Sequence, residues 1–347
     1  MVYNNTEVRA NLRGRRSILK NCLGAFAAAA ISIGVAGLSS VSEAQASDTT
    51  YKFAGSPTWL GQVPIMVAIE KGYFKDEGVN VEFTTILSSS DRIAALAAGS
   101  VHFSNLGRVA VIAEMARGND AFYFVGNVDD SPGNEGCWAR PGVGSIADLK
   151  GKKVAANSSA EITLTLLLQK NGMTQKDIEF INLPPTEMAP AISRGDVEAA
   201  CVWQPLLEGL KAAVPDGKLL GTDKDTAFYD EFKTMAAPDI VIMRRDLVNN
   251  EPEVASKIMA ALFKGAEFAT SDPDETAKIV SKYFKKEPGE IVESIRAFDY
   301  FGAKDWQAHF DVHKKQMQAL TNLLSDLGKI SERPDVSGWA KADFIKQ

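Results

Sequence analysis

The chain has few cysteines and no excess of basic residues, and these shortages exclude several classes of protein. Three cysteines among 347 residues are too few for a small disulfide-rich scaffold. Lys and Arg number 38 against 44 Asp and Glu, which gives a formal net charge of −6. Because nucleic-acid binding depends on clustered positive charge that neutralises phosphates, we expect no nucleic acid as a partner. Beyond residue 46 no stretch stays apolar for the ~20 residues that a membrane-spanning helix needs.

Recognisable catalytic motifs are absent from the sequence as well. It has no G-x-S-x-G elbow, no Walker loop and no dinucleotide fingerprint at a strand–helix junction. His309 and His313 are four residues apart, a spacing that can hold a metal on a helix, but no third ligand accompanies them. Their Lys- and Gln-rich surroundings indicate a solvated face, whereas His102 alternates with apolar residues and is expected to be structural. We therefore expect no catalytic residues, no metal and no cofactor.

The first 46 residues have the organisation of an export signal. Basic residues precede an Ala- and Gly-rich apolar run at 22–38, and a polar stretch follows that ends in A-Q-A at 44–46. The string GRRSILK at 14–20 resembles the twin-arginine export motif. We expect residues 1–46 to be a cleavable twin-arginine-like signal that directs the chain to the periplasm. The alternative is a single membrane anchor, for which the run is short and only weakly hydrophobic.

Cleavage of this signal would leave two cysteines, Cys137 and Cys201. An oxidising compartment would allow them to pair, but the sequence does not show whether they lie close enough. We expect two free, buried thiols.

Two parts of the chain repeat one order of predicted elements. Residues 51–105 predict a strand, a helix, a strand, a capped helix and a strand, and residues 152–203 predict the same order. The pattern A-[LI]-x-x-G-[SD]-V occurs in both parts, with Gly99 and Gly195 as the helix stops. We interpret this as an internal duplication, the alternative being that any α/β protein shows such units.

Alternating strands and helices predict an α/β fold with two parallel-sheet lobes. Ligands of such sheets bind beyond the carboxyl ends of the strands, so a cleft between the lobes is expected. The tail predicts helices at 253–271, 273–284, 288–298 and 305–327 that return to cover the first lobe. We expect lobe 1 to comprise residues 47–135 and 236–347, lobe 2 residues 136–235, and the hinge the connections near 128–142 and 234–240.

The loops expected to face this cleft are rich in Ser, Asn and Gly just before helices. Free N–H groups and the dipole at a helix N-terminus favour an anion there. Arg108 could add a bidentate contact to a carboxylate or sulfonate, or could lie on the first turn of a surface helix. These loops are residues 56–62, 88–91, 104–108, 133–136, 157–161, 202–205 and 237–239.

Aromatic and acidic residues in the same loops could bind a cation. Trp59 and Trp203 follow strands in corresponding positions, where they could hold an ammonium group by cation–π attraction or form part of the core. Asp239 opens an apolar strand, where a ligand's amino group could partner its carboxylate; a solvated turn is the alternative.

Several strings resemble the periplasmic substrate-binding proteins of nitrate, sulfonate and taurine ABC importers, with the taurine-binding branch closest. They are VAIEKGYFKDEGVNVEF, AALAAGSVHFSNLG, DLKGKKVAANSSAEITL, ISRGDVEAACVWQPLL and APDIVIMRRDL. This resemblance implies a type II periplasmic-binding fold, with two lobes joined by a double-crossover hinge that closes on a ligand. It also implies an ABC permease and ATPase as partners, and we expect the binding protein to be a monomer.

The resemblance assigns site residues by position. Taurine carries a sulfonate and an ammonium group, which suits helix N-termini with Arg108 at one end and Asp239 with Trp203 at the other. We therefore expect a small sulfonate as ligand and no enzymatic activity. The candidate ligand-binding residues are Trp59, Gln62, Asn105, Gly107, Arg108, Asn134, Glu135, Ser158, Ser159, Trp203 and Asp239.

Departures from the taurine branch leave other ligands open. Arg108 and Val109 stand where that branch carries small hydroxyl residues, and the loop SPTWLGQVP also differs. The ligand could be another small anion, or a pyrimidine precursor of thiamine stacked on tryptophan. Pyrimidine synthases share this fold and carry a cysteine-rich iron motif, but here the comparable stretch, GNEGCWARPG, has only Cys137. A sensory module that presents its ligand to a receptor is a further alternative.

Overall fold

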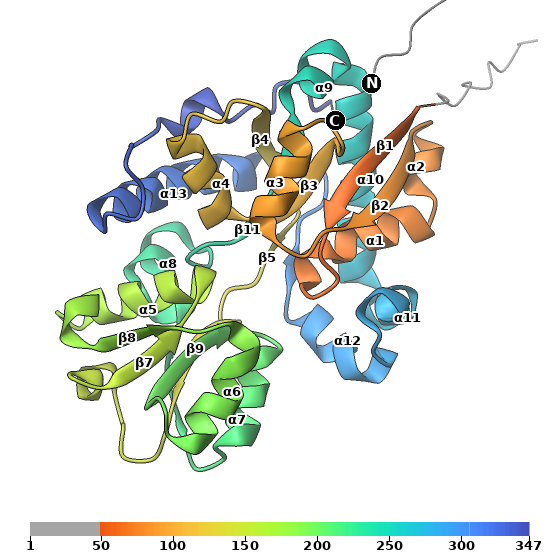
Figure 1. Cartoon of the computed structure of the whole chain (residues 1–347). Coiled ribbons are helices and arrows are strands. Elements are labelled where there is room, and N and C mark those ends of the chain that lie inside the picture. The colour runs from red at the N-terminus through yellow and green to blue at the C-terminus, as the bar shows by residue number, and fades with distance from the viewer. Residues whose placement is uncertain (1–48, 305, 347) are drawn as a thin grey trace, which may run out of the picture. The chain divides into compact units, whose positions relative to one another are not determined.

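The computed structural model describes residues 49–304 and 306–346 (Figure 1). The expected export signal at residues 1–46 lies outside the described residues. Residues Ala44–Gln347 form one compact unit. Within the described residues, no helix is both long enough and apolar enough to cross a membrane.

The first sheet has five strands in the order β2-β1-β3-β11-β4. Strand β1 pairs in parallel with β2 and β3, whereas β11 runs antiparallel to both β3 and β4. Strand β11 therefore arrives from a distant part of the chain to complete a sheet that the N-terminal part begins. The strands are β1 (Thr50–Gly55), β2 (Asn80–Thr85), β3 (Phe103–Gly107), β4 (Phe122–Gly126) and β11 (Asp239–Arg244).

The second sheet also has five strands, in the order β10-β6-β9-β7-β8. Strand β7 pairs in parallel with β8 and β9, and β6 runs antiparallel to β9 and β10. A small third sheet pairs β5 (Asp129–Asp130) with β12 (Asp299–Tyr300). The strands of the second sheet are β6 (Glu135–Ala139), β7 (Lys153–Ala156), β8 (Glu179–Asn182), β9 (Ala199–Trp203) and β10 (Lys218–Thr222).

The repeated order of elements is confirmed by strand pairing, because β2-β1-β3 and β8-β7-β9 have the same arrangement. The glycines that end the second helix of each repeat take left-handed backbone conformations, with φ of 78° at Gly99 and 83° at Gly195. Both sheets are mixed: β11 in the first sheet and β6 in the second run antiparallel to both of their neighbours. The lobe boundaries at residues 135 and 235 stay predictions.

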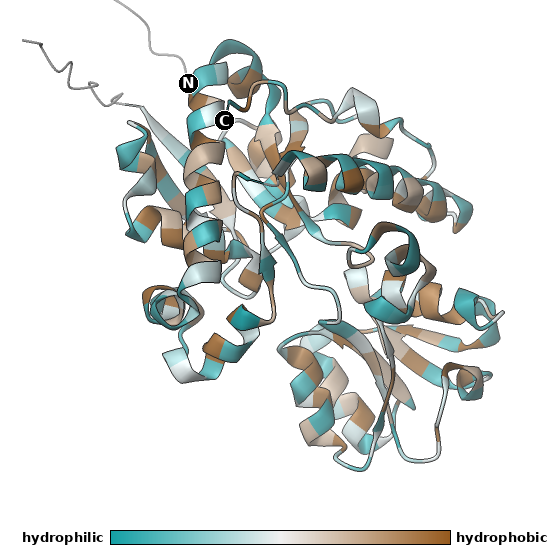
Figure 2. Cartoon of the chain, turned by 180° about the vertical axis from the view of Figure 1, so that it is seen from behind, coloured by the Kyte–Doolittle hydropathy of each residue, from teal (hydrophilic) through white to brown (hydrophobic). Residues whose placement is uncertain are grey.

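Helices cover both sheets, with apolar and polar residues on different sides (Figure 2). The helix at Ser89–Ala97 begins at the cap that the sequence predicts, because the Ser88 hydroxyl accepts a hydrogen bond from the Asp91 N–H at 3.3 Å. The helices along the N-terminal and middle parts of the chain are α1 (Val63–Glu70), α2 (Tyr73–Asp76), α3 (Ser89–Ala97), α4 (Arg108–Ala116), α5 (Ser158–Lys170), α6 (Pro185–Arg194), α7 (Leu206–Ala213), α8 (Ala227–Phe232) and α9 (Arg245–Asn250).

The tail forms four long helices and returns to the first sheet, as predicted. Helix α10 packs along α1 at Gly265, where an added Cβ would lie 2.1 Å from the Pro64 carbonyl oxygen. Helix α13 contacts α4 and β4. The tail helices are α10 (Pro252–Ser271), α11 (Pro273–Phe284), α12 (Pro288–Arg296) and α13 (Trp306–Asp326).

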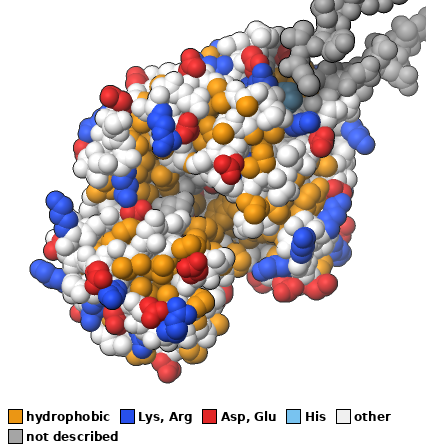
Figure 3. Space-filling view, viewed as in Figure 1, with side chains coloured by type: hydrophobic (Ala, Val, Ile, Leu, Met, Phe, Trp, Pro, Cys, Tyr) orange, Lys and Arg blue, Asp and Glu red, His pale blue; other side chains and the backbone are white. Residues whose placement is uncertain are grey.

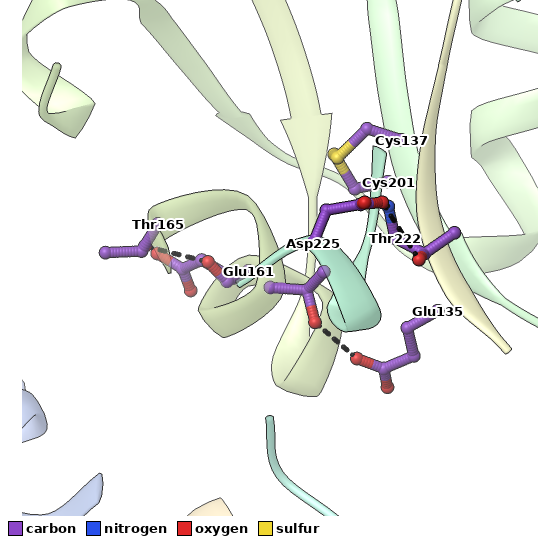
Figure 4. Close-up of a disulfide and its surroundings, with 8 residues drawn as sticks. Glu135, Cys137, Glu161, Thr165, Cys201, Thr222 and Asp225 are labelled. Atoms are coloured by element: carbon purple, nitrogen blue, oxygen red, sulfur yellow. Dashed lines mark hydrogen bonds between the residues drawn. A yellow bond between two sulfur atoms is a disulfide. The ribbon is translucent and has the colours of Figure 1, made fainter. Parts of the chain in front are cut away.

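Cys137 and Cys201 form a disulfide, so the expectation that they are free thiols is wrong (Figure 4). Antiparallel pairing of β6 with β9 sets Cys137 directly opposite Cys201, with their Cα atoms 4.0 Å apart. Both side chains lie in the core of the second sheet, packed with Val154 and Leu164. The sequence could not give this pairing, because the two residues are 64 positions apart and their register depends on the sheet.

Candidate ligand-binding site

A cavity of about 290 Å³ is lined by residues from both sheets. The space-filling view shows a hollow between the region built on the first sheet and the region built on the second (Figure 3). The first sheet contributes residues at and after the ends of β1, β2 and β3, and the second contributes residues at and after the ends of β7, β8 and β9. The cavity thus lies at the carboxyl ends of the parallel strands, as expected.

Two tryptophans form a right-angled corner of the cavity. The ring centroids of Trp59 and Trp203 are 6.4 Å apart, with 89° between the ring planes. Trp59 also meets the ring of Phe298 edge to face, with centroids 5.2 Å apart, so its position is fixed by packing. The buried indole N–H of Trp59 forms no well-aligned hydrogen bond within the protein, although it lies close enough to the Asp239 carboxyl group to lower the pKa of that group. A group that accepts hydrogen bonds would satisfy it.

Arg92, which the sequence reasoning missed, provides a buried cation on the cavity wall. Its side chain is only 5% exposed, and its Nη1 and Nη2 groups donate to the Asn105 carbonyl and the Ser89 hydroxyl, both at 2.9 Å. Burial lowers the pKa of Arg92, and the nearby Asp239 carboxylate opposes that shift. Its Nε–H has no partner. Arg92 comes directly after the predicted cleft loop 88–91, a position that points to the cleft but does not predict the burial of the side chain.

Arg108 lies at the first position of α4 and is fully buried, so the alternative of a surface helix turn is wrong. Its guanidinium group donates to the Gln316 side-chain oxygen and to Nδ1 of His313, the latter at 2.9 Å, which ties it to α13. Burial lowers the pKa of Arg108 to about 9, although Asp130 and Asp239 favour its charged form. Arg108 reaches the cavity wall, but most of its hydrogen bonds point away from it.

The predicted solvated face around the two helical histidines is also wrong for His313, which is buried. Because Arg108 can only donate, His313 Nδ1 must accept, which places the ring proton on Nε2. Burial, with Arg108 nearby, holds the pKa of His313 well below its usual value. The ring of His309 stacks on Phe301, with centroids 3.6 Å apart. In the described ranges, no group of His, Cys, Asp and Glu is arranged to hold a metal ion.

Two carboxyl groups also face the cavity. Asp239 is half-buried at the start of β11; burial raises its pKa to about 6, although Arg92 and Arg108 favour its ionised form. Glu135 begins β6 and accepts hydrogen bonds from the hydroxyls of Ser159 and Thr163, the latter at 2.8 Å. Burial raises the pKa of Glu135 to about 8. The cavity therefore combines unpaired N–H donors with carboxyl groups of unequal proton affinity.

The structure brings most of the predicted site residues to this cavity, but not all of them. Trp59, Gly107, Arg108, Glu135, Ser159, Trp203 and Asp239 line it. Gln62, Asn105 and Asn134 are instead buried behind it in contacts within the protein. Their side-chain amides donate to the carbonyls of Asn105, Gly61 and Ala297, respectively. Ser158 begins α5, and its side chain lies outside the described part of the chain. Ligand binding by all eleven candidate residues stays a prediction.

Two α/β sheets that share a cavity at the ends of their strands define the fold of periplasmic binding proteins, and a comparison with solved structures agrees. The periplasmic aliphatic sulphonate binding protein SsuA of Escherichia coli superposes with a TM-score of 0.70 at 17% identity, covering 84% of this chain and 92% of its own. The chain belongs to the NMT1/THI5-like family, whose pattern matches residues 60–276.

Curated relatives include both binding proteins and an enzyme. A protein of Brucella abortus named as a binding protein is 26% identical, covering 79% of this chain and 77% of its own. The taurine-binding periplasmic protein of Escherichia coli is also 26% identical, over 67% of this chain and 69% of its own. The 4-amino-5-hydroxymethyl-2-methylpyrimidine phosphate synthase of Saccharomyces cerevisiae is 25% identical, over 73% and 76%. These relatives confirm the family resemblance found in the sequence.

Proposed function

We propose that the protein is a solute-binding protein of an ABC importer and that it binds a small sulfonate, such as taurine, in the cavity between its sheets. The observation that carries this proposal is the wall of that cavity, where buried donors of Trp59 and Arg92 that lack well-aligned partners lie together with the carboxyl groups of Asp239 and Glu135. Ligand pockets in proteins span roughly 300–1,000 Å³, so a cavity of about 290 Å³ suits a small solute.

The unpaired donors favour an acidic group on the ligand. The Arg92 Nε–H is buried without a partner and the Trp59 indole N–H without a well-aligned one, and an unsatisfied buried donor costs roughly 1–3 kcal/mol. A sulfonate or carboxylate oxygen would accept from both, and a bond to the guanidinium is charge-assisted. The other two nitrogens of Arg92 are fixed by the protein, so the Nε–H is held in place to bind.

The carboxyl groups favour an amino group on the same ligand. Arg92 and Asp239 act on each other electrostatically, yet in the described part of the chain they form no direct ion pair. A short zwitterion can place its acidic group at the arginine and its ammonium group on the acidic side of the cavity. This arrangement suits taurine better than a plain anion such as nitrate.

The relatives and the disulfide support a periplasmic setting. The taurine-binding relative is periplasmic by name, and disulfides persist in oxidising compartments. We therefore place the protein in the periplasm as a monomer, exported by the twin-arginine-like signal and partnered by an inner-membrane permease. Lobe 1 (47–135 and 236–347) and lobe 2 (136–235) would close on the ligand about their crossover.

Other functions in this family fit the cavity less well. A flat pyrimidine ring would gain most between parallel aromatic faces, but the Trp59 and Trp203 rings stand at 89°. Cys137 is bonded to Cys201, so it offers no thiolate for an iron site of the kind expected in pyrimidine synthases. These two observations favour a binding protein without enzymatic activity.

A thermal-shift screen followed by titration calorimetry tests the proposal. The panel should include taurine, ethanesulfonate, β-alanine, nitrate and a hydroxymethylpyrimidine. We expect 1:1 binding of taurine and a higher melting temperature, since a ligand at 1,000 times its Kd adds about 4 kcal/mol of apparent stability. Binding of the pyrimidine but of none of the acids, or turnover of a bound compound, would contradict the proposal.

A further inference from the structure

The two acidic residues on the cavity wall differ in their charged neighbours. Arg92 and Arg108 both stabilise the ionised form of Asp239. By contrast, the charged groups with the largest effect on Glu135 are Asp223 and Asp239, both acidic. No Lys, Arg or His in the described ranges forms an ion pair with Glu135. Glu135 is therefore the carboxyl group for which the protein supplies no compensating cation.

The groups around Glu135 come from four elements. Helix α5 supplies the hydroxyls of Ser159 and Thr163, and β11 supplies Asp239. The segment after β10 supplies Asp223, which accepts a hydrogen bond from the Glu135 backbone N–H at 3.2 Å. The exposed Lys224 on that segment extends along Gly133. On β9, the residue paired with Glu135 is Trp203. Neutral donors and acidic neighbours surround the carboxyl group.

Such surroundings favour the protonated form of Glu135. The side chain is 1% exposed, and an ionised carboxylate without a cation is costly to bury. Two hydroxyl contacts leave part of its hydrogen-bonding capacity unused, because a carboxylate can accept about four hydrogen bonds. Figure 4 shows the Glu135 side chain, and a dashed line marks a hydroxyl contact to its carboxyl group.

We propose that Glu135 is the ammonium-binding residue of the cavity and carries a proton in the ligand-free protein, which the ligand's ammonium group replaces. This inference rests on the proposed function, and it assigns the ammonium group to Glu135, whereas the sequence favoured Asp239. When an amine ligand binds, the carboxyl O–H loses its proton to the buffer and the resulting carboxylate pairs with the ammonium. Trp203, on the neighbouring strand, adds a cation–π contact. Asp239 remains the counter-ion of the two arginines.

Titration calorimetry of the purified protein in several buffers tests this proposal. At pH 7, taurine is titrated in phosphate, HEPES and Tris, whose ionisation enthalpies differ, and the slope of the observed enthalpy gives the number of protons exchanged. With the pKa of Glu135 near 8, we expect about 0.9 protons released per taurine bound. The affinity for taurine should rise almost tenfold per pH unit between pH 6 and pH 7. Ethanesulfonate, which lacks the amine, should release none.

Variants identify the group that releases the proton. Glu135→Gln should abolish proton release and weaken taurine binding at least tenfold, with little change for ethanesulfonate. Asp239→Asn should keep the release. Glu161→Gln is the matched control, because Glu161 is a glutamate on α5 that pairs with Lys329 and does not line the cavity, and it should behave as the unaltered protein.

The outcomes separate this inference from the proposed function. Taurine binding without proton exchange in the unaltered protein would overturn the inference and leave the proposed function intact, and this result does not depend on any variant folding. Release that persists in Glu135→Gln and disappears in Asp239→Asn would assign the ammonium group to Asp239 and overturn it as well. No binding of any acid in the panel would contradict the proposed function itself.

Discussion

Removal of the Cys137–Cys201 disulfide should destabilise the protein measurably. The bond closes a loop between residues 64 positions apart, for which the loop-closure relation gives about 4 kcal/mol at 25 °C. Measured contributions of disulfides are usually 2–4 kcal/mol, so we expect the Cys137→Ala/Cys201→Ala double variant to lose about that much. The bond joins β6 to β9 two residues from the Glu135–Trp203 pair, so taurine affinity should fall as well.

Urea unfolding with and without dithiothreitol measures this loss. With a denaturant slope of roughly 3 kcal/mol per molar urea, the midpoint should fall by about 1 M on reduction and in the double variant. The double variant is the control for the reductant, since dithiothreitol should not move its midpoint. Equal midpoints in all samples, with Cys137 and Cys201 recovered as free thiols by peptide mass spectrometry, would refute the pairing and the reasoning built on it.

Three further predictions concern packing, binding and pH. Gly265→Ala should lower the free energy of unfolding, measured in urea, by about 1–3 kcal/mol, because the added Cβ would lie 2.1 Å from a carbonyl oxygen of α1. Gly289 has open space around it, so Gly289→Ala should change the free energy of unfolding by less than about 1 kcal/mol. Equal effects of the two substitutions would contradict the close α1–α10 contact. Arg92→Met should weaken sulfonate binding by roughly 1.5–3 kcal/mol, or about 10- to 100-fold in calorimetry, and unchanged affinity would remove Arg92 from the site. The raised pKa of Glu135 means that its proton favours the folded state; this contribution is complete below the unfolded pKa near 4.3 and is lost as the pH rises through about 8. As the pH rises through that window, Glu135 should therefore lower the free energy of unfolding by at most ~1.4 kcal/mol per pH unit, and Glu135→Gln should remove this decrease. Identical pH profiles for the two proteins would contradict the raised pKa of Glu135.

The order of elements could be predicted because it depends on local signals. Helices α10 and α11 end at the predicted residues, Ser271 and Phe284, and the capped start of α3 follows Ser88 as expected. The repeated order of strand, helix and terminating glycine predicted that β1–β3 and β7–β9 would be arranged in the same way. Apolar periodicity and caps act over a few residues, so one sequence contains enough information to place them.

The site could be predicted only in part, because its details depend on contacts between distant residues. The cleft loops were found from Ser-, Asn- and Gly-rich stretches, and Trp59, Trp203 and Asp239 indeed line the cavity. The role of Arg108 was not predictable, since its partners His313 and Gln316 lie more than 200 residues away.

The same limit explains what else the sequence did not predict. The antiparallel strands and the disulfide depend on pairings between distant segments, which no local pattern reports. Arg92 was missed because an arginine in the first turn of a helix is usually solvated, and only the tertiary structure buries it against the Asn105 carbonyl.

A crystal structure of the protein grown with taurine tests the central claim most directly. We predict one taurine molecule in the cavity between the two sheets, with a sulfonate oxygen within hydrogen-bonding distance of Arg92 Nε and Trp59 Nε1 and with its ammonium group beside Glu135 and Trp203. Taurine bound outside this cavity, or an empty cavity at saturating taurine, would contradict the account.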